Sequence, residues 1–317
     1  MSGVINSTCN LKVNRFIMKI KVITSYKPGT WESYAKRGIE SMAKNFPKEI
    51  DIVVYAEEPQ PICNESRIQW VDLNSAEPEL FKFKNKHKDD PVANGELQEI
   101  PNGVRRPAEL KVKGGKDKNK GSYLWAAVRF ANKVFCVVNG VRNSKDYDYV
   151  VWIDADTYTF RPVPLDFFIK QLPAETMVTY LGRENPKLND GGKYPECGFV
   201  GYNLKHPEIQ TFINEWEQLY VTDKVFKLLE WHDSYVFWHL TKKFRTEKNV
   251  KVNDIGYWIG VKGHHVFVNS ELGLYMDHMK GKRKNLGSSG RNDLRSNANA
   301  PVNVLEVDYW KKVPPTA

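Results

Sequence analysis

The stretch Tyr147-Asp148-Tyr149-Val150-Val151-Trp152-Ile153-Asp154-Ala155-Asp156 decides how this chain is expected to fold. Residues 149–153 are an unbroken apolar run of aromatic and β-branched residues, which is typical of a strand covered on both faces in a parallel sheet. In open α/β sheets, ligands bind just outside the carboxyl ends of the strands. Asp154 and Asp156 are therefore expected at a crevice, where their carboxylates can hold Mg²⁺ or Mn²⁺. The alternative is a strand-end turn in which the Asp side chains cap backbone amides.

A second motif follows near the C-terminus. The stretch Met276-Asp277-His278-Met279-Lys280-Gly281-Lys282-Arg283-Lys284 contains His-x-x-Gly-x-x-Lys. His278 offers an imidazole ligand to a divalent transition metal. Gly281 lets a backbone amide approach a phosphate closely, and Lys284 supplies positive charge to it.

Together the two motifs resemble those of the GT-A glycosyltransferases, most closely the glycogenin-like retaining family. The resemblance implies an α/β, Rossmann-like single domain over residues 18–317, with a mostly parallel central sheet flanked by helices. It also implies that Asp154, Asp156 and His278 bind the Mn²⁺ of a metal–nucleotide diphosphate, and that Gly281 and Lys284 contact the diphosphate. The family's Pro-Trp after that lysine is Asn285-Leu286 in this chain.

Upstream of the first motif, the pattern predicts a strand over 19–24, a helix over 31–45 and a strand over 50–55, the opening of a nucleotide-binding α/β fold. By the resemblance, the loop after the first strand holds the base and ribose, which makes Thr24 and Tyr26 candidates for binding the nucleotide. Ordinary turn chemistry is the alternative for both. Residues 1–17 lack periodicity and are expected to be a tail.

An amphipathic helix is predicted over 123–134, just before the motif strand. In glycogenin-like enzymes this helix carries an arginine that reaches the donor sugar. Arg129 matches that role, with Lys133 one turn on as a second candidate. A charge at the edge of an apolar helix can equally extend to water.

Two later segments supply candidate catalytic carboxylates. Residues 194–203 resemble the family's strand on the acceptor side of the crevice, and there Glu196 lies beside Gly198. Residues 230–235 resemble the Trp-His-Asp-Glu-Ser segment of blood-group-type transferases, so His232 and Asp233 carry over as donor-sugar ligands, while Ser234 replaces the glutamate. Glu196 or Asp233 can orient the sugar or take the acceptor's proton. A helix N-cap is the alternative role for Asp233.

The rest of the sequence predicts further helices and strands, and it contains two basic segments. Helices are expected over 165–171 and 212–229, a strand over 177–181 and a final strand over 302–307. Residues 280–295 are expected to form a flexible flap over the diphosphate. The stretch from about 74 to 120 loses its pattern and is predicted to be a basic insertion, which can attract polyanions or simply be a solvated loop.

The composition of the chain indicates the cellular location that is expected for it. The net charge is +9, no run of 18 uncharged apolar residues occurs, and the four cysteines are scattered. A cytoplasmic protein without a membrane span is therefore expected. The preferred function is Mn²⁺-dependent transfer of a sugar from a nucleotide sugar, such as a UDP-sugar, to a saccharide acceptor.

Other functions account for some of the same residues. A phage-type DNA glycosyltransferase acting on hydroxylated bases would use the basic insertion, and a protein side chain is a third acceptor class. A non-catalytic nucleic-acid-binding protein explains the charge but leaves the acidic crevice unexplained. An aspartyl phosphatase of the haloacid-dehalogenase type needs Thr or Val where Tyr158 stands. A nucleotidyltransferase has no need of the C-terminal His-x-x-Gly-x-x-Lys.

Overall fold

The computed structural model describes residues 18–97, 123–183, 194–256, 265–295 and 302–316. Within them, seven strands form one sheet in the order β3-β2-β1-β4-β7-β6-β8. These strands are β1 (Ile20–Ser25), β2 (Asp51–Ala56), β3 (Ile68–Asp72), β4 (Tyr149–Ile153), β6 (Val178–Leu181), β7 (Glu196–Asn203) and β8 (Val252–Asp254). β7 runs antiparallel to both of its neighbours, and the other pairs in the sheet are parallel. The predicted α/β class with a mostly parallel central sheet is confirmed.

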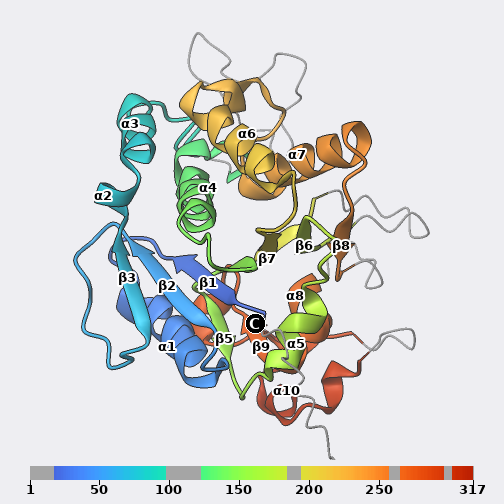
Figure 1. Ribbon diagram of the computed structural model, residues 1–317. Helices are drawn as coiled ribbons and strands as arrows, with labels where there is room; N and C mark the ends of the chain where they lie inside the picture. The colour runs from blue at the N-terminus through green and yellow to red at the C-terminus, as the bar shows by residue number, and fades with distance from the viewer. Residues whose placement is uncertain (1–17, 98–122, 184–193, 257–264, 296–301, 317) are drawn as a thin grey trace, which may run out of the picture.

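Helices cover both faces of this sheet (Figure 1). One face carries α4 (Ala127–Arg142), α6 (Ile209–Val221) and α7 (Asp233–Glu247), and the other carries α1 (Lys36–Asn45), α5 (Leu165–Gln171), α8 (Val266–Asn269) and α10 (Asp308–Lys312). Successive residues of β4 pack into opposite layers: Trp152 into the core cluster on the α4 side, Val151 into the cluster on the α1 side. Burial on both faces explains why the strand is apolar at every position.

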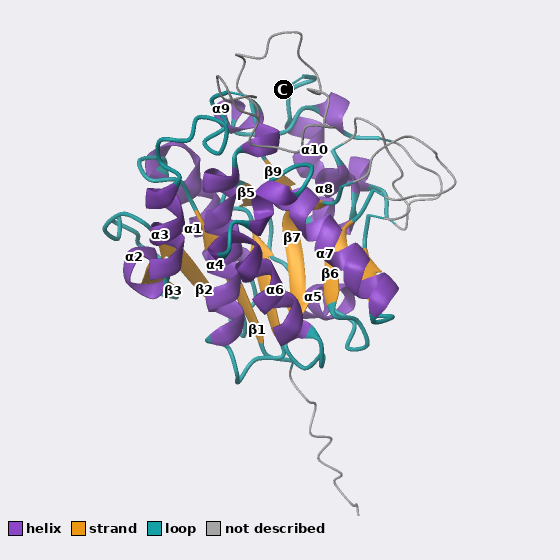
Figure 2. Ribbon diagram, turned by 90° about the horizontal axis from the view of Figure 1, so that it is seen from above, coloured by secondary structure: helices purple, strands orange, loops and turns teal. Residues whose placement is uncertain are grey.

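A small antiparallel sheet pairs β5 (Thr157–Thr159) with β9 (Met276–His278). Figure 2 shows these two strands together at one end of the large sheet, near α9 (Arg283–Leu286). The pairing joins the two sequence motifs, because β5 directly follows the Asp-x-Asp segment and β9 ends at His278. Two distant parts of the chain thereby meet at one edge of the molecule.

Some predicted elements differ from those observed. α4 begins at Ala127 and continues to Arg142, and every residue of the apolar run Val134–Val138 is buried, so the helix is enclosed on all sides there. The predicted helix over 212–229 is observed as α6 and ends at Val221, shortly before Asp223, whose φ is 58°. The strand predicted over 302–307 is wrong: Val304–Glu306 forms a 3-10 turn that the Asn303 side chain caps, and α10 follows.

The predicted insertion and flap are partly structured. Residues 74–97 include most of α2 (Leu73–Ala76) and α3 (Pro78–Lys86), whereas 98–122 and the tail 1–17 lie outside the described residues. Within 280–295, Arg283 forms an ion pair with Asp293, and the fully buried Ser289 donates a 2.6 Å hydrogen bond to Asp277. The Ser289 hydrogen bond joins this segment to β9, and the Arg283–Asp293 pair lies within the segment itself. Closure of the segment as a flap over the diphosphate stays a prediction.

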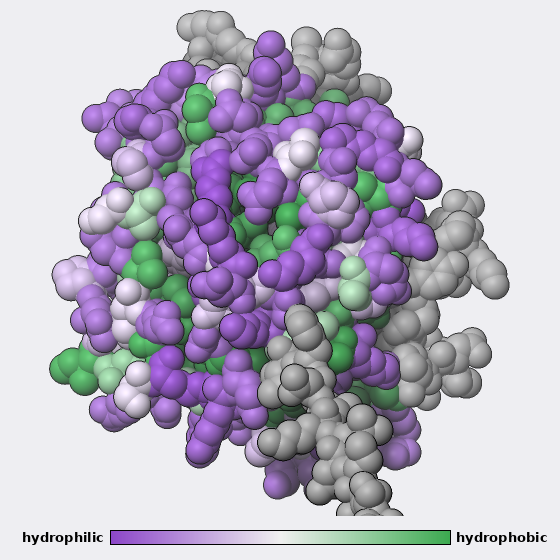
Figure 3. All heavy atoms as spheres, viewed as in Figure 1, coloured by the Kyte–Doolittle hydropathy of each residue, from purple (hydrophilic) through white to green (hydrophobic). Residues whose placement is uncertain are grey.

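The face of the molecule seen in Figure 3 is mainly polar. On the face seen in Figure 3, hydrophilic residues predominate and hydrophobic ones show between them in small groups. Among the described helices, none combines the length and the apolar character needed to span a bilayer.

Candidate metal centre at the carboxyl end of β4

The order of the strands defines where a ligand site is expected. From β1 the chain continues to β2 and β3 on one side and then returns to β4 on the other side of β1. Such a reversal opens a crevice outside the carboxyl ends of the two central strands. Asp154 is the first residue after β4, and its backbone N–H donates a 3.0 Å hydrogen bond to the carbonyl of Gly198. The first carboxylate of the Asp-x-Asp motif therefore lies at this crevice.

The pairing of β5 with β9 brings His278 to the same place. Thr157 faces His278 in the register of the two strands. The Nε2 atom of His278 lies 3.3 Å from Asp154 Oδ2 and 3.2 Å from Asp156 Oδ1. His278 is 1% exposed and Asp156 is 6% exposed. An imidazole nitrogen and two carboxylates thus converge in a largely buried position.

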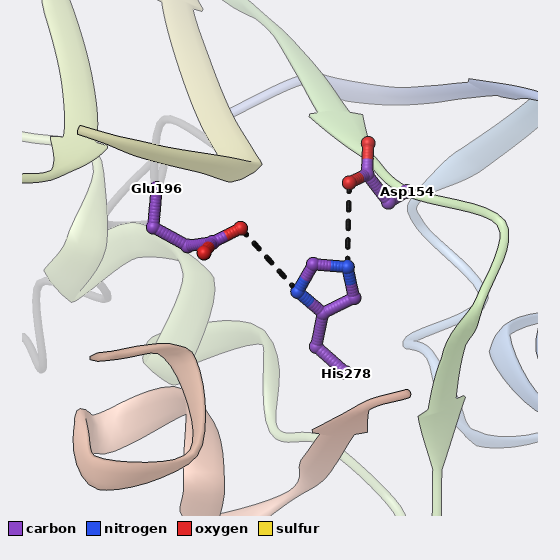
Figure 4. A group of neighbouring side chains, drawn as sticks. All are labelled: Asp154, Glu196 and His278. Carbon is purple, nitrogen blue, oxygen red and sulfur yellow. Dashed lines mark ion pairs between the residues drawn. The ribbon is translucent and has the colours of Figure 1, made fainter. Parts of the chain in front are cut away.

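Glu196 occupies the opposite side of the imidazole ring (Figure 4). Its Oε1 lies 3.5 Å from His278 Nδ1, while its Oε2 lies 3.2 Å from Lys280 Nζ and 3.4 Å from Arg183. His278 Nδ1 has no hydrogen-bond partner within the described part of the chain. The ring therefore presents one nitrogen to the Asp pair and the other to Glu196.

Opposite charges in this cluster stabilise one another's ionised forms against the effect of burial. Burial would lower the pKa of His278, but the carboxylates of Asp156 and Asp154 raise it to about 10. Burial would raise the pKa of Asp154, but the neighbouring charges of Lys133 and His278 hold it well below its usual range. Burial would also raise the pKa of Glu196, and Lys280 and His278 lower it instead. The carboxylates are therefore kept ionised, the state in which they bind cations.

Ligand atoms of Asp154, Glu196 and His278 all lie within 4.8 Å of one another, so this buried group can hold a metal ion. Because Asp154 and Glu196 face different ring nitrogens, an ion bound to Nε2 would take Asp154 and Asp156 as its carboxylate ligands. The 3.2–3.3 Å separations match the edge of an octahedron of oxygen and nitrogen ligands, about 3 Å for metal–ligand bonds of about 2.1 Å. The residues present fit a divalent cation on that side of the ring, provided that its binding displaces the proton from His278 Nε2.

Lys133, rather than Arg129, reaches this crevice from α4. Its Nζ lies 2.9 Å from Asp154 Oδ1 and 2.7 Å from Asp233 Oδ2. Arg129 is exposed, and its guanidinium lies over the ring of Phe130. Lys133 thus bridges the carboxylates of Asp154 and Asp233, the first residue of α7. The spacing of one helical turn between the two cations made Lys133 a candidate in the sequence.

His232 and Asp233 have different surroundings. His232 caps α7, because its Nδ1 accepts from the Tyr235 backbone N–H at 3.4 Å, and its Nε2 lies 2.9 Å from Glu230. Both ring nitrogens of His232 are thereby engaged within the protein. Asp233 lies in the first turn of α7 and faces the crevice through Lys133.

The remaining predicted residues lie at the end of β1 or after β9. Thr24 and Tyr26 are buried at the carboxyl end of β1, and the Thr24 hydroxyl has no hydrogen-bond partner among the described residues. Gly281 follows β9 with a φ of +66°, and nothing in the described structure lies within 4 Å of where its Cβ would be. Lys284 Nζ lies 3.0 Å from Asp156 Oδ2 and above the ring of Tyr34.

Sequence reasoning missed Lys280 and Arg183, the two cations that neutralise Glu196. Lys280 stands inside the His-x-x-Gly-x-x-Lys motif, at a position that the motif leaves open. Arg183 lies two residues after the end of β6 and carried no signal in the sequence. Neither a scan against models of protein families nor a search of curated proteins finds a match to this chain.

Proposed function

We propose that this protein is a metal-dependent glycosyltransferase of GT-A type, which transfers a sugar from a nucleotide-diphosphate sugar to an acceptor hydroxyl. The observation that carries the proposal is the convergence of Asp154, Asp156 and His278 Nε2, with separations of 3.2–3.3 Å, at a reversal point of the sheet. Nucleotides bind at such points in α/β folds. The resemblance of both motifs to the glycogenin-like family gives the same assignment.

Each group has a role in that reaction. Asp154, Asp156 and His278 hold the cation, for which Mn²⁺ or Mg²⁺ is the expected ion because the ligands are oxygen and imidazole nitrogen. Lys284, which contacts Asp156 at 3.0 Å, is placed to turn toward the diphosphate. Thr24 and Tyr26, at the end of β1, are the candidates for contacts with the nucleoside.

The transfer breaks the bond between the anomeric carbon and the phosphate oxygen, and the electron pair leaves with the diphosphate. The bound cation supplies Lewis-acid stabilisation of that departing charge. Lys284 and the backbone at Gly281 add positive potential at the same side of the crevice. The acceptor oxygen forms the new bond to the anomeric carbon, and its proton passes to a carboxylate or to water.

Of the two candidate catalytic carboxylates, Asp233 is the better placed to meet the sugar. Its Oδ2 shares Lys133 with the metal-side carboxylate Asp154, so it lies on the crevice side of the cluster. Glu196 is 3% exposed and is enclosed by His278, Lys280 and Arg183. Its surroundings favour a role in positioning His278 over direct contact with substrate.

A screen of nucleotide sugars tests the proposal. The protein is incubated with individual UDP-, GDP- and CMP-sugars and Mn²⁺, and the release of free nucleotide is measured. We expect slow hydrolysis of one donor, abolished by a chelator and by Asp154→Asn, and retained in Asp166→Asn, an acidic residue on α5. Hydrolysis that persists with the chelator, or no turnover of any donor, would contradict the proposal.

A further inference from the structure

The carboxylate of Asp154 has its two oxygens in different surroundings. Its Oδ1 accepts a 2.6 Å hydrogen bond from the indole N–H of Trp152 and lies 2.9 Å from Lys133 Nζ. Its Oδ2 lies 3.3 Å from His278 Nε2, so that one oxygen points toward the imidazole and the other away from it (Figure 4). The protein therefore holds Oδ1 and leaves Oδ2 on the side where a cation would bind.

Trp152 is fixed in place at the end of β4. Side chains two residues apart on a strand lie on the same face of the sheet, so the Trp152 indole and the Asp154 carboxylate are neighbours. The indole is 2% exposed and packs in the core cluster beneath α4, and Lys133 Nζ lies over its ring, 5.1 Å from the centre. A large ring in a close-packed core has little freedom to turn, so the core sets the direction of its N–H.

A hydrogen bond of this kind restricts how a carboxylate binds a metal ion. Ca²⁺ takes about six to eight oxygen ligands and accepts a carboxylate through one oxygen or both, whereas Mg²⁺ requires a nearly regular octahedron. Mn²⁺ also occupies octahedral sites of oxygen ligands. Because Trp152 and Lys133 engage Oδ1, Asp154 offers a cation only Oδ2. Binding through one oxygen favours the octahedral ions.

We propose that Trp152 is a positioning residue of the metal centre: its indole N–H holds Asp154 so that the carboxylate binds a cation through Oδ2 alone, which favours Mn²⁺ or Mg²⁺ over Ca²⁺. The inference rests on the metal centre of the proposed function and adds how the chain selects the ion. The partners behind a metal ligand fix its orientation. The competing explanation is that the N–H only satisfies a buried oxygen, which would affect stability and not metal binding.

Other buried tryptophans have purely structural surroundings. Trp310 donates to the backbone carbonyl of Gly273 at 2.7 Å, and the Trp216 indole N–H has no hydrogen-bond partner among the described residues. Trp216 lies in the same core cluster as Trp152 and is 1% exposed. A substitution at Trp216 therefore reproduces the loss of buried ring volume without the loss of a bond to Asp154.

The test is the affinity of Trp152→Phe for metal ions alone, because phenylalanine keeps an aromatic ring and lacks the N–H. Mn²⁺ binding is measured from the electron paramagnetic resonance signal of the free ion, and Ca²⁺ binding from its competition with Mn²⁺. We expect the affinity for Mn²⁺ to fall by about 10–100-fold and the affinity for Ca²⁺ to fall less, so that the preference for Mn²⁺ narrows. Trp216→Phe should keep the parent's affinity for both ions, although its melting temperature falls.

A second measurement uses the parent protein and so stands even if Trp152→Phe does not fold. The tryptophan indoles are labelled with the heavy nitrogen isotope for magnetic resonance. The Trp152 N–H signal is identified as the one that traces of Mn²⁺ broaden first, because Trp152 bonds to a candidate metal ligand. Hydrogen-bonded N–H groups resonate downfield, so this signal should remain downfield when Mg²⁺ saturates the site.

Three results would overturn this inference alone: an affinity for Mn²⁺ that falls no further in Trp152→Phe than in Trp216→Phe, equal losses for Mn²⁺ and Ca²⁺ in Trp152→Phe, or an upfield move of the indole signal on adding Mg²⁺. The last would mean that the cation has taken Oδ1. Absence of Mn²⁺ binding to the parent would overturn the metal centre as well, which distinguishes failure of the proposed function from failure of the role of Trp152.

Discussion

Gly198 lies directly against His278: a Cβ atom at position 198 would stand 2.7 Å from His278 Cε1 and 2.8 Å from its Nδ1. Because Gly198 has no side chain, the imidazole of His278 fits between Glu196 and the Asp pair. Because glycine lacks a Cβ, another group can approach the backbone of Gly198 closely. In the structure the group that approaches is the candidate metal ligand itself.

Gly198→Ala should therefore displace His278. We expect the affinity for Mn²⁺ to fall by about 10–100-fold, as when a metal ligand loses its orientation, with a stability loss of about 1–3 kcal/mol from overpacking. Gly201→Ala is the control, because its Cβ would clash with Leu172, at 2.4 Å, and not with the cluster. Equal Mn²⁺ affinities in the two variants would remove the positioning role of Gly198.

Glu196→Gln tests whether the carboxylate that faces His278 Nδ1 contributes to metal binding. The substitution preserves volume but removes the charge beside His278 Nδ1, at 3.5 Å. Mn²⁺ affinity should fall by about tenfold, because the partners behind a ligand fix its orientation and basicity. Glu217→Gln changes a buried carboxylate paired with Arg142 on α4, and should leave metal binding unchanged. If both variants bind Mn²⁺ like the parent, Glu196 has no positioning role.

Lys133→Met removes the cation between Asp154 and Asp233. Asp233 then loses its ion pair with Lys133 while Asp154 keeps His278, and breaking a buried pair by removing one partner costs about 3–5 kcal/mol. Mn²⁺ should restore part of this loss, so the rise in melting temperature on adding Mn²⁺ should be larger in the variant than in the parent. A smaller rise in the variant would mean that Lys133 is needed to form the metal site.

The link between α3 and the end of α6 should depend on pH. Asp223 contacts Lys86 at 2.6 Å and His87 at 2.8 Å. Burial raises the pKa of Asp223, but hydrogen bonds from Lys86 and His87 lower it overall. A depressed carboxyl pKa stabilises the fold above the unfolded value, about 4, and this stabilisation is lost as the pH falls through the folded pKa.

Asp223→Asn is a conservative probe of that link, because asparagine tolerates the left-handed backbone at this position, where φ is 58°. At pH 7 we expect a loss of about 1 kcal/mol in the free energy of unfolding, the scale of a partly exposed pair. The difference between variant and parent should disappear in acid. Denaturant unfolding across this pH range measures it, and a difference that stays constant down to the acid limit would contradict the assignment.

Much of the fold could be predicted because it depends on local pattern. The apolar run at 149–153 is apolar at each position because helices cover both faces of β4, and that signal lies entirely within the run. The prediction of a final strand was wrong because two local signals compete: Val302–Val307 has β-forming residues, but the Asn303 side chain accepts from the Leu305 N–H and favours a helical turn.

The site could be predicted only where the residues belong to motifs. Asp154, Asp156 and His278 stand in short patterns, whereas Arg183 becomes relevant only because β6 and β7 pair and bring it to Glu196. Arg129 and Lys133 lie one turn apart on the same face of α4, so the choice between them depends on how far along the helix the crevice lies. Long-range pairing of this kind leaves no trace in a local stretch of sequence.

Calorimetric titration of Mn²⁺ with UDP into the parent protein and into Asp156→Ala is the most direct test of the metal–nucleotide site. Asp308→Ala, which alters an exposed carboxylate on α10, is the matched control. We predict metal-dependent UDP binding in the parent and in Asp308→Ala, and none in Asp156→Ala, with all three proteins folded. Unchanged affinity in Asp156→Ala would contradict the account.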